Sequence, residues 1–193
     1  MRICVFGAAS PTIDAEYIEK VEALGKELAL RGHSLVFGGG GNGLMGAAAR
    51  GVRDGGGHIL GVFPEFFMEN GAELLCDFCD ELVVPKTMRE RKRIMEENAD
   101  AFVIVPGGIG TYEEFFEILT SKQLCRHNKP IAIYNINGYY DKIILAMQDA
   151  IEKSFIRATC LGLFCISEDT EKLFEYIEAP AEDIKSIKEL KDG

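Results

Sequence analysis

The chain has 193 residues, of which 47% are hydrophobic and 27% are charged. Such a chain is long and apolar enough to bury a core without disulfides or metal, which excludes wholesale disorder. Its formal net charge of −10 argues against a general nucleic-acid-binding protein, because nothing on the scale of the chain would neutralise phosphates. One small phosphorylated ligand at a local basic site remains compatible with this charge.

The N-terminal residues and the cysteines bear on the compartment. Residues 1–10 enter an apolar run after one arginine, which is too short and too poorly flanked for a signal peptide. No apolar stretch approaches the roughly 18 residues that a membrane-spanning helix needs. The six cysteines lie singly in or near apolar segments, which favours free thiols in a reducing cytosol. We therefore expect a cytoplasmic protein that binds neither membranes nor nucleic acid.

Cys76 and Cys79 form an isolated CxxC pair. A zinc site would need a second pair, and the other cysteines and the histidines are poorly spaced for one. Plain packing is the favoured interpretation, with metal or redox chemistry as the alternative. We expect no metal and no cofactor.

Short β-branched runs alternate with helical patterns along the chain, which is typical of a parallel sheet flanked by helices. The first strand is predicted at 3–6, and an amphipathic helix over 14–31 follows it and ends at Gly32. Further strands are predicted at 34–37, 59–63, 81–84, 101–105, 131–134 and 163–166. Further helices are predicted at 44–53, 88–98, 111–126 and 139–154, and a last one after Ser167 as its N-cap.

This order of elements predicts one domain over residues 1–193, since no repeat or linker interrupts it. The expected fold class is α/β: a Rossmann-like, doubly wound open sheet, mainly parallel, of about seven strands with helices on both faces. Residues 168–193 are rich in acidic side chains, and we expect a C-terminal helix and a fraying tail there. In such sheets ligands bind outside the C-terminal ends of the strands.

The loop after the strand at 101–105 contains three glycines in four residues and then a threonine: Gly107, Gly108, Gly110 and Thr111. Glycines let the backbone curl so that several N–H groups point at one place, beside the positive end of the next helix. A phosphate group fits such a place, and Thr111 would add a hydroxyl and cap the helix. We interpret the loop as phosphate-binding, with a tight turn made only for packing as the alternative.

More than half of the 21 glycines lie between Gly38 and Gly61. The run from Gly38 to Gly46 lacks the lysine of a P-loop and fits the dinucleotide-binding pattern only loosely. Close approach of its backbone to a ligand or to a neighbouring loop explains it equally well.

The helix after the phosphate loop begins with three acidic residues, Glu113, Glu114 and Glu117. Acidic residues there can simply complement the helix dipole and remain solvated. Glu114, however, lies three residues after Thr111 and four before Ile118, so it shares a face with the loop and with the apolar side. A carboxylate that faces a phosphate pocket is costly unless it serves a developing positive charge, which favours Glu114 as a catalytic group.

The segment 86–93 carries a net charge of +4 in a chain whose total is −10. Thr87 and Glu90 have the spacing of a capping box, so a helix is predicted to begin here. Arg91 and Lys92 lie three or four residues from the methionines of this helix, so both project near its inward stripe. A solvated basic face is the alternative, but the local charge favours a site for an anionic ligand.

Two motifs together resemble the paired signature of the Lonely Guy (LOG) family: Met88-x-x-Arg91-Lys92 and Pro106-Gly107-Gly108-x-Gly110-Thr111-x-x-Glu114. These proteins are cytokinin riboside 5′-monophosphate phosphoribohydrolases, also described as possible lysine decarboxylases. The resemblance extends to the run Gly38–Gly46 and to Gly138-Tyr139-Tyr140, and it covers residues 2 to 157. It implies a hydrolase that converts an adenosine 5′-monophosphate, plain or N6-modified, into free base and ribose 5-phosphate. It also implies a homodimer whose sites lie near the subunit interface.

The resemblance also implies roles for single residues. Arg91 and Glu114 are the implied catalytic pair: Glu114 stabilises positive charge on the ribose or activates water, and Arg91 favours departure of the base. The implied substrate- and phosphate-binding residues are Lys92, Gly107, Gly108, Gly110, Thr111, Thr120, Glu73 and Ser10. Ser10 is the hydroxyl kept where the family has Cys-Gly-Ser-Ser, and the segment around Glu73 is otherwise dissimilar.

The same motifs bear on two other functions. A pyridoxal-phosphate decarboxylase needs a Schiff-base lysine, and Lys92, the only lysine directed toward the pocket, belongs to a helix better explained by phosphate binding. We reject that function. A non-catalytic nucleotide-binding or carrier protein on the same fold is the alternative, although a carrier has no need of Glu114 facing an anion site.

Overall fold

The computed structural model describes residues 1–71 and 73–180. Its seven strands form one sheet in the order β4-β3-β2-β1-β5-β6-β7, and every neighbouring pair is parallel. The strands are β1 (Arg2–Phe6), β2 (Ser34–Phe37), β3 (Ile59–Val62), β4 (Glu81–Val83), β5 (Ala101–Ile104), β6 (Ile131–Tyr134) and β7 (Cys165–Ser167). The order reverses between β1 and β5, which is the arrangement of a doubly wound, Rossmann-like sheet. The predicted fold class is therefore confirmed.

Helices connect the strands. They are α1 (Ala15–Leu30), α2 (Gly43–Asp54), α3 (Glu65–Asn70), α4 (Met88–Asn98), α5 (Ile109–Gln123), α6 (Asp141–Glu152) and α7 (Thr170–Glu178), with short 3-10 helices at Ile136–Gly138 and Ala158–Leu163. Among the described residues, no helix is long and apolar enough to cross a membrane.

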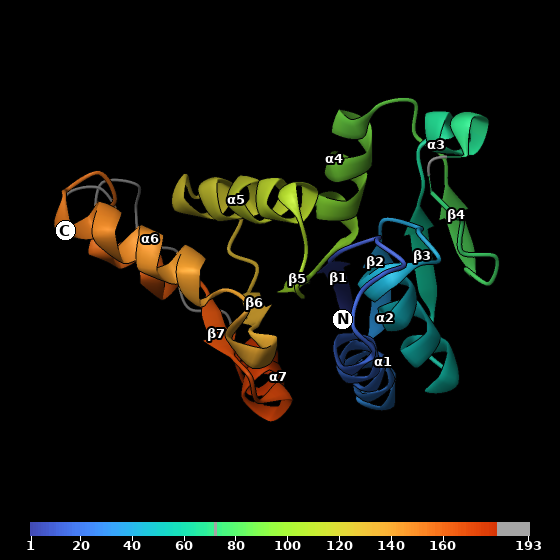
Figure 1. Ribbon diagram of the computed structural model, residues 1–193, viewed down its shortest axis with the longest axis horizontal. Helices are drawn as coiled ribbons and strands as arrows, with labels where there is room; N and C mark the ends of the chain where they lie inside the picture. The colour runs from blue at the N-terminus through green and yellow to red at the C-terminus, as the bar shows by residue number, and fades with distance from the viewer. Residues whose placement is uncertain (72, 181–193) are drawn as a thin grey trace.

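The sheet separates two hydrophobic cores, because successive side chains of a strand point to opposite faces. Ile3 and Val5 of β1 pack with α1, α2 and α7, whereas Cys4 and Phe6 pack with α4, α5 and α6. Figure 1 shows α4 and α5 above the strands and α1, α2 and α7 below them. All six cysteines are free thiols, as predicted.

Three local predictions were wrong. The helix α3 was not predicted, because its six residues are too few to show a helical period. Strand β7 starts two residues late, since Ala158–Leu163 forms a 3-10 helix. The last helix is capped by Asp169, whose side chain accepts from the N–H of Glu171, and Ser167 instead accepts from the N–H of Asp169. The predicted tail after residue 180 lies outside the described residues.

Candidate active site

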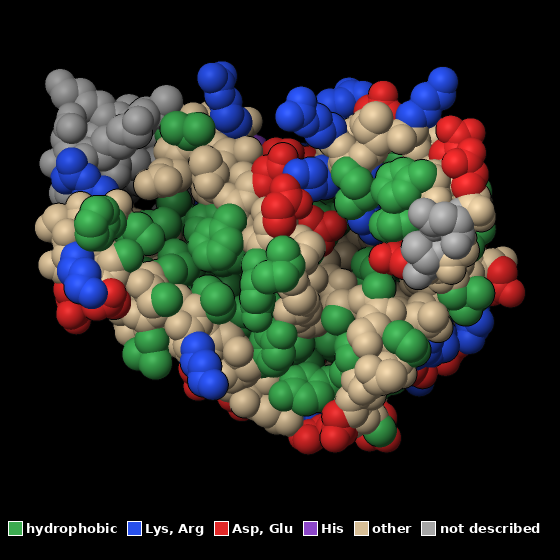
Figure 2. Space-filling model, turned by 45° about the horizontal axis from the view of Figure 1, so that its top comes forward, with side chains coloured by type: hydrophobic (Ala, Val, Ile, Leu, Met, Phe, Trp, Pro, Cys, Tyr) green, Lys and Arg blue, Asp and Glu red, His purple; other side chains and the backbone are tan. Residues whose placement is uncertain are grey.

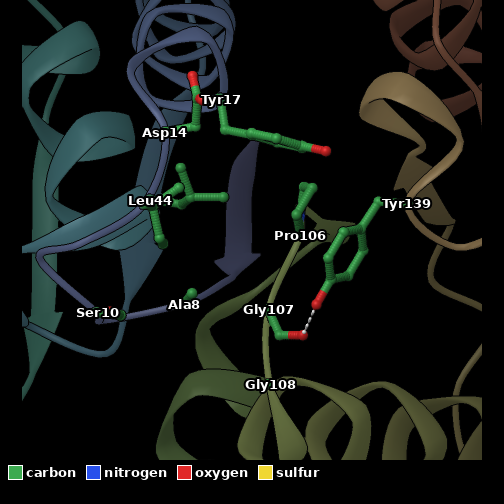
Figure 3. Close-up of a pocket in the computed structure, with 10 residues that line it drawn as sticks. Ala8, Ser10, Asp14, Tyr17, Leu44, Pro106, Gly107, Gly108 and Tyr139 are labelled. Atoms are coloured by element: carbon green, nitrogen blue, oxygen red, sulfur yellow. Dashed lines mark hydrogen bonds between the residues drawn. The ribbon is translucent and has the colours of Figure 1, made fainter.

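A cavity of about 230 Å³ lies where the strand order reverses, at the C-terminal ends of β1 and β5. Its walls come from the β1–α1 loop, the start of α1, the start of α2, the phosphate loop and the segment before α6. They are Ala8, Ser10, Ile13, Asp14, Tyr17, Leu44, Pro106, Gly107, Gly108 and Tyr139, and Figure 3 shows most of them around the space. Ligands of doubly wound sheets bind at this position.

Helix α4 carries Arg91, which is not among the residues that line this cavity. The predicted capping box is present: Thr87 accepts from the N–H of Glu90, and Glu90 accepts from the N–H of Thr87. One turn later, the Arg91 side chain is only 5% exposed, and it donates to the carbonyls of Val62 at 3.2 Å and Gly38 at 3.1 Å. These bonds hold the guanidinium at the C-terminal ends of β2 and β3.

Gly38 makes room for that guanidinium. A Cβ atom at this position would lie 1.9 Å from Nη2 of Arg91, so any larger residue would displace the arginine. The backbone that follows Gly38 is hydrogen-bonded to the segment before β4. The N–H of Gly41 donates to the carbonyl of Leu74, and the N–H of Cys76 donates to the carbonyl of Gly39. Close packing on neighbouring protein segments therefore explains much of the glycine run.

Glu114 faces Arg91 from α5. Nη1 of Arg91 lies 4.0 Å from a carboxylate oxygen of Glu114, and both side chains are buried. Burial raises the pKa of Glu114 to about 7, although the charge of Arg91 acts in the opposite direction. Near neutral pH this carboxyl group can therefore either accept or donate a proton. The spacing argument that favoured Glu114 over its acidic neighbours agrees with this, since Glu113 and Glu117 are exposed.

Glu73 reaches the same place from an irregular segment. One of its carboxylate oxygens is buried and has no hydrogen-bond partner among the described residues. That oxygen lies 3.4 Å from where a Cβ of Gly40 would be, so it faces the glycine run. Burial raises the pKa of Glu73, and Arg91 lowers it, so the two side chains share one electrostatic environment. A buried acceptor without a donor suits a ligand hydroxyl or amino group.

The phosphate loop presents N–H groups and occupies its carbonyls. The carbonyl of Pro106 accepts from the N–H of Ala8, and that of Gly108 accepts from the N–H of Tyr112. Within the described part of the chain, the N–H groups of Gly108, Ile109 and Gly110 donate to no protein acceptor. Free N–H groups at the start of a helix can bind an anion.

Thr111 does not cap α5, contrary to the prediction. The helix begins two residues earlier, and Gly108 is the N-cap without any side-chain cap. Thr111 is buried in the first turn, and its hydroxyl would lie 2.1 Å from a Cβ of Gly107. Thr111 packs directly against the backbone of Gly107, and only a glycine at position 107 leaves room for this contact.

The other implied binding residues are not all gathered here. Nζ of Lys92 binds Glu113 and lies 2.7 Å from a carboxylate oxygen of Glu117. Thr120 is exposed on the same side of α5 as these two glutamates, about 9 Å along the helix from Glu114. Ser10 lines the cavity, and its hydroxyl bonds that of Thr12 at 3.0 Å.

Three neighbours of the site were given no role by the sequence. The ring of Phe67, from α3, lies 6.0 Å below the guanidinium of Arg91. Tyr139 and Tyr140 donate to carbonyls of the phosphate loop and of the residue before it. The motif Gly138-Tyr139-Tyr140 was a visible signal, but the contacts of these tyrosines join segments more than 30 residues apart.

Comparisons with known proteins identify relatives of this chain. The family model described as "Possible lysine decarboxylase" matches residues 45–177. The "Probable cytokinin riboside 5'-monophosphate phosphoribohydrolase LOG6" of Arabidopsis thaliana is 39% identical over 176 residues, covering 91% of this chain and 87% of that protein. The "Cytokinin riboside 5'-monophosphate phosphoribohydrolase LOG4" of the same plant is 37% identical, covering 92% and 81%.

Solved structures share the fold. The molybdenum cofactor carrier protein of Chlamydomonas reinhardtii superposes with a TM-score of 0.68 at 22% identity, covering 92% of this chain and 95% of that one. The molybdenum cofactor binding protein of Rippkaea orientalis gives a TM-score of 0.66 at 20% identity, covering 92% and 93%. At such identity the likeness concerns the fold alone. From the family model and the curated relatives, the chain belongs to the LOG family of cytokinin riboside 5′-monophosphate phosphoribohydrolases.

Proposed function

We propose that this protein hydrolyses the N-glycosidic bond of an adenosine 5′-monophosphate, plain or N6-modified, and releases the free base and ribose 5-phosphate. The observation that carries this is the buried pair of Arg91 and Glu114, at 4.0 Å, together with loop N–H groups at the start of α5 that donate to no acceptor in the described part of the chain. The names of relatives up to 40% identical describe the same reaction.

In the proposed chemistry, Glu114 acts on the ribose and Arg91 acts on the base. Cleavage of the glycosidic bond passes through a transition state with oxocarbenium character, in which positive charge develops on the ribose. The ionised carboxylate of Glu114 stabilises that charge and orients or deprotonates the attacking water. The guanidinium of Arg91 donates hydrogen bonds to the departing base and stabilises the negative charge that develops on it. The base is released with one proton, which balances the proton that Glu114 removes from the attacking water.

The phosphate loop supplies binding energy away from the reacting bond. The N–H groups of Gly108, Ile109 and Gly110 bind the 5′-phosphate and fix the sugar relative to Glu114. Gly107 and Thr111 shape this loop, and Ser10 faces the substrate across the cavity. We assign the unpartnered oxygen of Glu73 to a hydroxyl or amino group of the substrate.

The decarboxylase description does not suit the lysines present. Burial alone would lower the pKa of Lys92, but its ion pairs with Glu113 and Glu117 raise it above the usual value. A Schiff-base lysine must lose its proton, so this environment opposes that role. Lys122 is buried and its pKa is lowered, but it lies about 12 Å along α5 from Glu114 and donates to the carbonyl of Lys129.

The assembly and compartment belong to the proposal too. Figure 2 shows hydrophobic side chains gathered over the face that carries α5 and α6. The exposed apolar residues of these helices include Ile109 and Phe116 of α5 and Leu145 of α6, and Phe155 after α6 is also exposed. We propose that two copies of the chain pair through this face. Lys92 of α4 and Thr120 of α5, which lie on the same side as Glu113 and Glu117, would then contact substrate in the assembled dimer. Six free thiols favour the cytoplasm as the compartment.

The proposal is tested by incubating the protein with AMP and with N6-isopentenyl-AMP and measuring free base and ribose 5-phosphate. We expect release from at least one, and Glu114→Ala should lower the rate by about 10²- to 10⁴-fold while largely sparing binding. Glu97→Ala, which removes an exposed carboxylate of α4, is the matched control and should keep full activity.

Binding of both nucleotides without release of base would favour a carrier instead of a hydrolase. A Glu114→Ala variant with full activity would contradict the catalytic role of this residue alone. The comparison of the two substrates shows whether the base is plain or prenylated adenine.

A further inference from the structure

The peptide carbonyls on either side of Pro106 are each held by a tyrosine. Tyr140 is fully buried and donates to the carbonyl of Val105 at 2.8 Å. Tyr139 is 37% exposed and donates to the carbonyl of Gly107 at 2.7 Å, and Figure 3 shows this bond beside the cavity. These two adjacent residues lie between β6 and α6, so a separate segment of the fold supports the phosphate loop from outside.

The bond from Tyr139 fixes the direction of one N–H group. In a trans peptide, the C=O and the N–H point to opposite sides of the unit. When the carbonyl of Gly107 points toward Tyr139, the N–H of Gly108 must therefore point away from it. Glycine at 107 and 108 gives this peptide little side-chain restraint of its own. A donor outside the loop is then what keeps the peptide from flipping.

We propose that Tyr139 is a positioning residue for the anion-binding loop: its hydroxyl holds the 107–108 peptide so that the N–H of Gly108 faces the phosphate. This inference rests on the proposed function, because it concerns how the same loop holds the 5′-phosphate. If the peptide turned over, a carbonyl oxygen would face the anion, and the loop would lose a donor and gain a repulsive dipole.

The surroundings of Tyr139 keep its hydroxyl in the donating state. The hydroxyl of Tyr112 donates to that of Tyr139 at 3.4 Å, which leaves the hydrogen of Tyr139 for the carbonyl of Gly107. Burial and this neighbour raise the pKa of Tyr139 to about 12. The ring is held edge-on by Tyr17, at 6.4 Å between centroids, and by Tyr140 at 5.1 Å.

Phenylalanine at 139 tests the proposal, since Tyr139→Phe keeps the ring and the cavity wall and removes only the hydroxyl. We would titrate wild type and variant with inorganic phosphate and with ribose 5-phosphate by calorimetry, and measure KM and kcat for AMP. Loss of one positioning hydrogen bond should weaken phosphate binding and raise KM by roughly three- to tenfold, with kcat within about twofold. Tyr176→Phe is the matched control: it removes a tyrosine hydroxyl that donates to the carbonyl of Leu163, away from the cavity, and it should leave both constants unchanged.

Unchanged phosphate affinity in Tyr139→Phe would overturn the proposal. So would an equal loss in Tyr176→Phe, or a fall in kcat at constant KM. If the wild type releases no base from any nucleotide, the hydrolase proposal fails, but the phosphate titrations still decide the role of Tyr139. Melting temperatures of the variants should stay close to that of the wild type, which separates a change in the loop from a loss of folding.

Discussion

At the scale of single residues, the chemistry of the site depends on how far Arg91 offsets the burial of Glu114. A carboxyl group in an apolar environment favours its neutral form, and a nearby guanidinium favours the ionised form. Here burial prevails, so the pKa of Glu114 is about 7. Arg91 itself is held by two backbone carbonyls, so it stays in place when Glu114 changes its protonation state.

The pH dependence of activity should report this balance. Because Glu114 is proposed to act when ionised, kcat/KM for AMP should increase about tenfold per pH unit as the pH rises toward 7. It should level off above pH 7. Arg91→Met removes the charge that lowers the pKa of Glu114, so the rising limb should move to higher pH. The plateau should also fall by at least about tenfold, since a charged hydrogen bond to the substrate is lost.

Arg93→Met is the matched control for this profile, because it removes an exposed cation from the same helix. The rising part of its pH profile should coincide with that of the wild type. If the rising part of the pH profile of Arg91→Met stays in place or moves to lower pH, Arg91 does not lower the pKa of Glu114.

The residues of the site differ in how far the sequence could identify them. Glu114 was separable from Glu113 and Glu117, because the helical spacing placed it on the buried face. Glu73 lies in a segment without a period, so only a resemblance pointed to it, and only the fold shows its unpartnered oxygen. Thr120 was implied in the same way, and in this chain it lies apart from the catalytic pair.

At the scale of elements, α4 is the helix on which the site depends most. It starts with a complete capping box and delivers Arg91 to the ends of two strands within one turn. A change in where α4 begins would therefore displace the guanidinium of Arg91.

Thr87→Ala should destabilise the protein by about 1 kcal/mol, because the N–H of Glu90 loses its side-chain acceptor. Urea unfolding measures this as a lower midpoint with an unchanged slope. Thr87→Ser keeps the hydroxyl and should retain most of the stability. Equal stability of Thr87→Ala and the wild type would show that the cap contributes nothing here.

Helix ends were predictable where a local signal was strong. The bounds of α4 agree with the prediction from its capping box, and β2 and β6 also agree. The start of α5 was predicted wrongly, because a threonine suggested a cap where the backbone of Gly108 already forms one. An N-cap made by backbone geometry has no side-chain signature to find.

At the scale of the whole molecule, a basic segment lies within a chain whose net charge is negative. The net charge is −10, yet the basic start of α4 faces the carboxylates of α5, where Lys92 joins Glu113 and Glu117. Lys92 and, through Glu97, Arg93 are therefore paired with carboxylates of the protein. Arg91 is the buried arginine of this segment, and it faces Glu114.

The proposed dimer is tested by the mass in solution. Light scattering after gel filtration should give twice the 21.3 kDa of one chain. Leu145→Glu, on the exposed side of α6, should shift this mass toward the monomer, because it places a charge in the apolar face. Leu30→Glu, which changes a similarly exposed leucine at the end of α1, should leave the mass unchanged.

A wild type with the mass of one chain would contradict the dimer. A dimeric Leu145→Glu variant would show that the copies pair through another face.

The sequence by itself determined the α/β fold class, most helices and strands, the family and the two motifs. These features depend on periodicity and spacing within continuous segments, and such patterns survive without knowledge of contacts. The tertiary structure decided that the guanidinium of Arg91 packs against Gly38, that burial raises the pKa of Glu114 to about 7, and that the hydroxyl of Tyr139 donates to the carbonyl of Gly107. Burial, pKa and hydrogen bonding are sums over neighbours from separate segments, and only the folded chain brings those segments together.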